Sequence, residues 1–184
     1  MKKSHPFLKL ISITALFAIS SHAEVIQKPT DFLKEQLASY PKKTKEVFPL
    51  NEKLKSSLKA QELELLTDQV TFYYGKDASG ALKLACLLTF ENGKEGMIQV
   101  GTCFEKDGTT KSYKILESSE DRGRAALNPD YLTQFTKSKS TEGLGTASKI
   151  DGLSGATITW KALVRAKKKA SLLFNELVLK GKTS

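Results

Sequence analysis

Histidine is nearly absent from this sequence of 184 residues, and tryptophan occurs once. The two histidines, His5 and His22, both precede residue 24. The chain from residue 24 onward therefore has no imidazole to act as a general base or as a metal ligand. This argues against a Ser-His catalytic triad and against the usual zinc sites.

Cysteine is equally scarce, and its placement excludes one cofactor. Neither Cys86 nor Cys103 belongs to a Cys-x-x-Cys-His sequence, so c-type haem attachment is not indicated. A hairpin turn at Asn92–Gly93 would place the two cysteines on neighbouring strands, within reach but not clearly opposite. A disulfide and two buried free thiols are both compatible with this placement.

No apolar run is long enough to cross a bilayer, which takes about 20 residues. The short apolar core Leu10–Ile19 follows Lys2 and Lys3 and precedes the small residues of Ser21–His22–Ala23. This order predicts a cleavable signal peptide over residues 1–23, with a retained interfacial anchor as the alternative. We therefore expect a soluble protein in the periplasm or another extracytoplasmic space.

Positive charge predominates, with 29 lysines and arginines, 20 acidic residues and a net charge of +9. Cleavage after Ala23 would remove three lysines and leave a net charge of +6. Export, together with the lack of a basic-aromatic motif, argues against nucleic acid as a partner. The run Arg165–Lys169 is predicted to form the solvated face of a helix, with a docking surface for an acidic redox partner as the alternative.

The middle of the chain has the pattern of an antiparallel sheet. Short apolar or alternating runs predict strands, and Asn-Gly and Asp-Gly between them favour hairpin turns. The predicted strands are Val70–Tyr74, Ala81–Phe90, Gly96–Phe104 and Ser112–Glu117. Their order along the chain predicts a β-meander.

Helical patterns flank these strands. The first spans Pro29–Tyr40 and the second runs from after Pro49 to near Thr67, with a basic break at Pro41–Lys45 between them. A short helix is predicted at Pro129–Phe135, capped by Asn128. The fold class is therefore α+β: an antiparallel β-meander packed with N-terminal helices and a long C-terminal helix. We divide the exported chain into an N-terminal helical arm, 24–68, and a domain at 69–180.

The C-terminal helix follows a loop of small residues, Asp151–Thr159, which reads Asp-Gly-Leu-Ser-Gly-Ala-Thr-Ile-Thr. Ser and Thr are good N-caps, so the helix is predicted to begin near Thr157 or Thr159. A small-residue loop opening a helix presents backbone N–H groups and the positive end of the helix dipole, which suits a phosphate. A simple loop and cap is the alternative. The apolar residues that recur along one face are Leu163, Ala166, Ala170, Leu173, Phe174, Leu177 and Val178.

The loop sequence resembles the flavinylation motif of the FMN-binding domain family. Members of that family include the C subunit of the sodium-pumping NADH:quinone reductase and the G subunit of Rnf-type complexes. An exported flavin transferase that uses FAD esterifies the Thr after Gly-Ala through the FMN phosphate. The resemblance therefore implies FMN covalently attached to Thr157. The implied cofactor-binding neighbours are Asp151, Ser154, Gly155, Ala156 and Thr159.

The resemblance extends loosely over about Val70 to Val178. At Glu120–Gly123, relatives often carry an acidic-Thr-Pro-Gly loop near the flavin; here only the acidic residue and the Gly agree. The resemblance implies an electron carrier with a phosphoester-linked FMN. Its implied partners are a flavin transferase and redox donor and acceptor proteins, which in one setting belong to a membrane complex. The alternatives are a non-covalent module for FMN or another phospho-ligand, and a flavin-dependent reductase component. No catalytic residue and no metal site are predicted.

The signal peptide gives the first testable prediction. Fractionation of the native host should place the protein outside the cytoplasm, and intact mass should show a chain that begins at Glu24, because the small residues before it suit signal peptidase. A full-length chain in the cytoplasm would show that the signal is misassigned.

Overall fold

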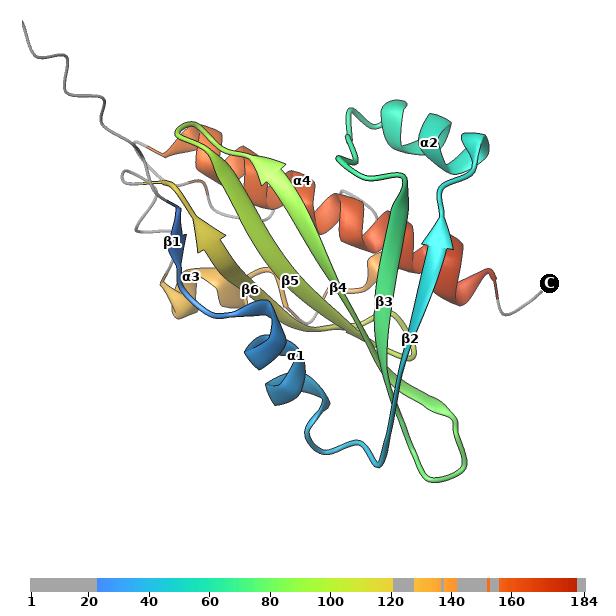
Figure 1. Cartoon of the computed structure of the whole chain (residues 1–184). Coiled ribbons are helices and arrows are strands. Elements are labelled where there is room, and N and C mark those ends of the chain that lie inside the picture. The colour runs from blue at the N-terminus through green and yellow to red at the C-terminus, as the bar shows by residue number, and fades with distance from the viewer. Residues whose placement is uncertain (1–22, 121–127, 137, 142–151, 153–155, 182–184) are drawn as a thin grey trace, which may run out of the picture.

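The structure, a computed structural model, describes residues 23–120, 128–136, 138–141, 152 and 156–181. A six-stranded antiparallel sheet in the order β1-β6-β5-β4-β3-β2 runs through the molecule (Figure 1). Its strands are β1 (Glu24–Val25), β2 (Lys42–Pro49), β3 (Gln69–Lys76), β4 (Leu82–Asn92), β5 (Met97–Glu105) and β6 (Thr110–Ser118). The helices are α1 (Pro29–Leu37), α2 (Glu52–Lys59), α3 (Pro129–Thr133), α4 (Thr157–Phe174) and the π-helical η3 (Asn175–Leu179). The predicted α+β fold class is confirmed.

The strands β3 to β6 form the meander that the turn residues predicted. Asn92 pairs with Met97 across the β4–β5 hairpin, and the Gly93 N–H donates to the Gly96 carbonyl at 2.8 Å. In the β5–β6 turn, Gly108 has φ +86°, and a Cβ there would lie 2.4 Å from the Ser140 Oγ. Glycine is required at this turn because any side chain would be both strained and obstructed.

Two of the helix boundaries follow from local hydrogen bonds. Asn128 caps α3 as predicted, since its side chain accepts from the Asp130 N–H at 2.9 Å. The helix predicted to reach Thr67 instead ends at Lys59, because Glu62 takes a left-handed conformation with φ 56°. Leu63 then turns back into the core. Among the described residues, no helix combines the length and the apolarity needed to cross a membrane.

The predicted basic break at Pro41–Lys45 is wrong, because β2 begins at Lys42 and pairs with β3 over its whole length. Every β2 side chain is exposed except Phe48, which packs partly buried against the core. An edge strand with one inward apolar residue has no alternating pattern to reveal it. Lysines on such an edge discourage pairing with another chain.

α4 packs along one face of the sheet and α1 against the other (Figure 1). The Phe174 ring stacks on Phe104 with centroids 4.7 Å apart and lies 6.3 Å from Phe72. The helix face was predicted correctly: Leu163, Ala166, Leu173 and Phe174 are buried, and Leu177 is partly buried. On the α1 side, Phe32 lies so close to Gly101 that a Cβ there would be 2.5 Å from the ring.

A disulfide joins Cys86 of β4 to Cys103 of β5. The two residues are directly paired in the sheet, and their Cα atoms are 4.0 Å apart. Both are fully buried beneath α1 beside Phe32. The register thus decides between the two alternatives that the sequence left open.

Removing the Phe174 ring tests the packing of α4. Phe174→Ala should lower the free energy of unfolding by about 3–5 kcal/mol, because a buried aromatic ring is lost and a cavity remains. Leu177→Ala, at a partly buried position one turn later, should cost less. Urea denaturation of both variants gives the comparison; an unchanged midpoint for Phe174→Ala would show that this face is not part of the core.

Candidate functional site

The small-residue motif lies at the N-terminus of α4. Ala156, Thr157 and Thr159 are described by the structure, whereas Asp151, Ser154 and Gly155 lie outside the described residues. α4 begins at Thr157, one of the two starts that the sequence predicted. The site is therefore built here from the first turn of α4 and from what packs against it.

The first turn of α4 has no side-chain cap. The N-cap is Ala156, at φ −128° and ψ 37°, so the expectation of a Ser or Thr cap is wrong. The first helical hydrogen bond runs from the Trp160 N–H to the Ala156 carbonyl at 2.9 Å. Within the described part of the chain, the N–H groups of residues 157–159 have no acceptor. These donors and the helix dipole together favour an anion at this end.

The two threonines of this turn have opposite surroundings. Thr159 is buried, and its hydroxyl donates to the Glu120 Oε2 at 2.5 Å. Thr157 is exposed, and its hydroxyl makes no hydrogen bond to another described residue. At about 100° per residue, the two side chains leave the helix roughly 200° apart. Of these two described threonines, Thr157 is the one whose hydroxyl is exposed.

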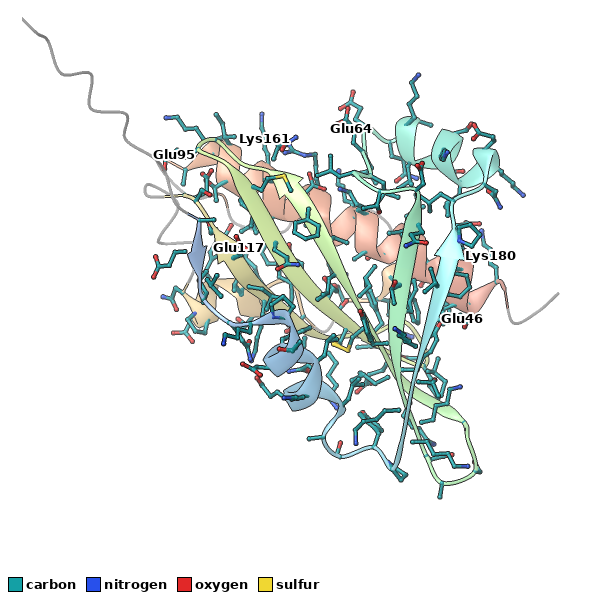
Figure 2. The ribbon with its side chains drawn as sticks, in the orientation of Figure 1. Glu46, Glu64, Glu95, Glu117, Lys161 and Lys180 are labelled. Carbon is teal, nitrogen blue, oxygen red and sulfur yellow. A yellow bond between two sulfur atoms is a disulfide. The ribbon has the colours of Figure 1, made fainter. Side chains whose placement is uncertain are left out.

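Lys161 adds a positive charge on the Thr157 side of the helix. Residues four apart lie one above the other on a helix surface, so Lys161 is a neighbour of Thr157. Lys161 is exposed and makes no ion pair with another described residue. Figure 2 shows it at the same end of the molecule as Glu95 of the β4–β5 turn. Sequence reasoning missed this lysine, although its i+4 spacing from Thr157 was visible.

Glu120 connects the first turn of α4 to the sheet. It lies just beyond β6 and is 5% exposed. Its Oε1 accepts from the Glu95 N–H at 2.7 Å, while its Oε2 accepts from Thr159. The sequence marked Glu120 only as the acidic start of a loop; its two partners are distant along the chain and become visible only in the fold.

The basic run of α4 is not a solvated face, which corrects the prediction from the sequence. Lys167 and Lys169 are buried, and Lys169 forms an ion pair with Glu91 of β4 at 2.5 Å. Lys169 also donates to the Phe90 carbonyl at 2.9 Å. Arg165 donates from Nε to the other Glu91 oxygen at 3.1 Å. These charges face the sheet and hold α4 in register on β4.

A second polar contact holds the first half of α4. The Tyr113 hydroxyl of β6 donates to the Leu163 carbonyl at 2.6 Å. Burial raises the pKa of Tyr113 well above its ordinary value, so the phenol keeps its proton for this bond at any physiological pH. Tyr113 and Glu91 thus hold the middle of α4 on the sheet, whereas the first turn, which carries Thr157, is bonded through Glu120.

Two cavities lined by described residues lie away from the first turn of α4. One of about 590 Å³ lies between α2 and the segment that follows it, and is lined by Leu50, Leu58 and Leu63 among others. Another of about 300 Å³ lies beside Glu91 and Arg165. Across the described ranges, no cluster of three or more His, Cys, Asp or Glu side chains is placed to hold a metal ion.

The described residues suit attachment of a phosphate group at Thr157. Thr157 and Lys161 share one side of the helix, and the first N–H groups of α4 have no acceptor among the described residues. The buried carboxylate of Glu120 lies on the opposite side, bonded to Thr159, so it does not confront an anion at Thr157. These described residues could tether a phosphate and offset part of its charge.

Comparison with known proteins finds a matching family and a similar fold. Residues 93–171 match the family model of the FMN-binding domain, a range that includes both Glu120 and Thr157. The fold is similar to the crystal structure of NqrC from Shewanella oneidensis, with a TM-score of 0.58, 15% identity, and coverage of 82% of this chain and 88% of that one. A comparison with curated proteins found no match. The family resemblance inferred from Asp151–Thr159 is thereby confirmed.

The buried ion pair of α4 generates a stability prediction. Lys169→Met should lower the free energy of unfolding by up to about 3–5 kcal/mol, because Glu91 stays buried with one cationic partner fewer. Lys168→Met, on the partly exposed neighbour, should change it by less than about 0.5 kcal/mol. A Glu91→Gln, Lys169→Met double variant should recover part of the loss in urea denaturation. Equal effects of the two lysine variants would contradict a buried pair.

Proposed function

We propose that the FMN-binding domain of this chain carries FMN in phosphoester linkage to Thr157 and serves as an exported electron carrier. The family match over residues 93–171 supports a flavin-binding, electron-transfer role. The covalent bond, its position and the export are the finer parts of the proposal. The motif neighbours Asp151, Ser154, Gly155, Ala156 and Thr159 are proposed to surround the attachment point.

The observation that carries this proposal is the contrast between the two threonines. The Thr159 hydroxyl is buried and bonded to Glu120, whereas the Thr157 hydroxyl is exposed without a described partner. Moving Thr159 to a phosphate would break a charge-assisted hydrogen bond, which is among the stronger kinds in proteins. Thr157 incurs no such loss, and it occupies the attachment position implied by the family motif.

Attachment is a phosphoryl-group transfer in which the chain supplies one oxygen. The Thr157 Oγ forms a bond to the phosphorus of the FMN half of FAD. The bond from that phosphorus to the bridging oxygen breaks, and AMP leaves with the bonding electron pair. The Thr157 hydroxyl proton passes to the leaving phosphate or to solvent. No oxidation or reduction accompanies this step, and a flavin transferase is the proposed catalyst.

The chain's residues then act as tether and electrostatic support. Thr157 would hold the phosphate, the first-turn N–H groups of α4 would donate to it, and Lys161 would offset part of its charge. When bound, FMN supplies an isoalloxazine ring that accepts and returns electrons, which side chains alone do not do. A covalent tether suits a protein outside the cytoplasm, where a dissociated cofactor is lost by diffusion.

The proposed setting follows from the sequence features around the domain. Residues 1–23 are proposed as a cleaved signal peptide, and redox donor and acceptor proteins as partners, with a membrane electron-transfer complex as one assembly. We retain 24–68 as an N-terminal arm and 69–180 as the FMN-binding domain. β2 of the arm belongs to the same sheet as β3–β6, so the two parts share one core.

The attachment site is tested by changing the hydroxyl alone. The full chain is co-expressed with a flavin transferase, denatured and separated, and covalent flavin is read from fluorescence and intact mass. Thr157→Val should abolish the retained flavin because it removes the attacking oxygen at nearly constant shape. Thr157→Ser should keep it, and Thr159→Val should keep at least part of it.

The outcomes separate the candidate functions. Flavin retained by denatured Thr157→Val would show that another residue is esterified, with Ser154 the nearest candidate. Wild-type protein that binds FMN but releases it on denaturation would instead support a non-covalent binding module. The melting temperature of the two Thr157 variants should match that of wild type, because Thr157 is exposed. Thr159→Val should lower it, because the buried Glu120 carboxylate loses a hydrogen-bond donor.

A further inference from the structure

The segment beyond β6 and the first turn of α4 are joined through one buried carboxylate. Glu120 accepts the Glu95 N–H with one oxygen, at 2.7 Å, and the Thr159 hydroxyl with the other, at 2.5 Å. Its own N–H donates to the Ser118 Oγ at 3.1 Å. Three elements therefore meet at this side chain: the end of β6, the β4–β5 turn and α4.

The β4–β5 turn is shaped to approach Glu120 closely. A Cβ at Gly93 would lie 2.3 Å from the Glu120 Oε1, and one at Gly96 would lie 2.7 Å from the Ser119 Oγ. Real side chains do not approach this closely, so both glycines allow the turn to lie against the segment after β6. The carboxylate is thus enclosed on the side of the hairpin as well as on the side of the helix.

A carboxylate buried to this extent is costly unless its oxygens are hydrogen-bonded. Each described bond uses a different oxygen, and bonds to a charged acceptor are roughly twice as strong as neutral ones. The positions of Thr159 and of the β4–β5 turn are therefore coupled. A shift of the first turn of α4 would leave the carboxylate without one of its donors.

This coupling acts on the first turn of α4, whose N-cap residue Ala156 provides no side-chain bond. Helix termini without caps fray. Thr157 lies two residues before Thr159 in the same turn. The direction of its hydroxyl therefore depends on whether Thr159 stays bonded to Glu120.

We propose that Glu120 is a positioning residue for flavin attachment: through Thr159 it fixes the first turn of α4 so that Thr157 meets the transferase in one orientation. This rests on the proposed attachment at Thr157. Glu120 takes no part in the bond making, and it points away from the Thr157 side of the helix. Glu120 instead affects how the attacking oxygen is oriented, and the rate of a group transfer depends strongly on that orientation.

The test measures the rate of flavin attachment to the purified chain by a flavin transferase with FAD. The concentration of the chain is varied so that kcat and KM are each determined. Glu120→Ala and Thr159→Val should each lower kcat by about 10- to 100-fold, because the attacking oxygen is no longer held in line. KM for the chain should change little, since the exposed surface around Thr157 is retained. Thr159→Ser keeps the donor and should restore the wild-type rate.

A double variant distinguishes positioning from general loss of stability. Glu120→Ala, Thr159→Val should be no slower than either single variant, because both remove the same hydrogen bond. Glu91→Gln is the matched control: it alters another buried glutamate that contacts α4, lowers the melting temperature, and should leave kcat unchanged. All rates are taken below the melting transition of the least stable variant.

Two results would overturn the inference while leaving Thr157 as the attachment site: Thr159→Val modified at the wild-type rate, or Glu91→Gln slowed as much as Glu120→Ala. Thr159→Val preserves side-chain shape, so this arm holds even if Glu120→Ala fails to fold. If wild type itself takes up no flavin, the proposed function fails and this inference fails with it. The inference is supported if both single variants are slowed, the double variant is no slower than either one, and Thr159→Ser restores the wild-type rate.

Discussion

The fold depends on α4 lying flat against the meander. Its apolar face contributes Ala170, Leu173 and Phe174 to the larger core, and the Phe174 ring packs between Phe72 and Phe104 of β3 and β5. An antiparallel sheet with an uncovered apolar face is not stable in water, so the helix and the sheet need one another. Because the same helix begins with the motif threonines, its packing also determines where Thr157 is presented.

Apolar contact alone leaves a helix free to slide and rotate on a sheet, and polar contacts remove that freedom here. Glu91 pairs with Lys169 and Arg165, Tyr113 donates to the Leu163 carbonyl, and Glu120 receives Thr159. Each buried polar group is costly if its partner moves away, so these bonds act as register marks along the helix. Three points along α4 are thereby fixed to different strands or strand ends.

The same contacts divide the polar residues of α4 into two functional groups. Those facing the sheet make structural contacts, and they include lysines that the sequence pattern predicts to be exposed to solvent. Thr157 and Lys161, near the N-terminus of α4, face outward. Both are exposed, and neither makes a side-chain hydrogen bond or an ion pair with another described residue. The proposed phosphate site is thus a helix end that is held on its inner side and whose first N–H groups have no acceptor among the described residues.

The sequence by itself determined the periodic and local features: the meander, the Asn128 cap, the apolar face of α4 and its start at Thr157. These depend on turn chemistry and helical spacing, which short segments carry within themselves. Only the tertiary structure decided the rest. The strand β2, the Cys86–Cys103 bond, the burial of Lys169 and the pairing of Glu120 with Thr159 join residues far apart in the chain. Such contacts arise from strand register and helix placement, for which a single sequence has no local signal.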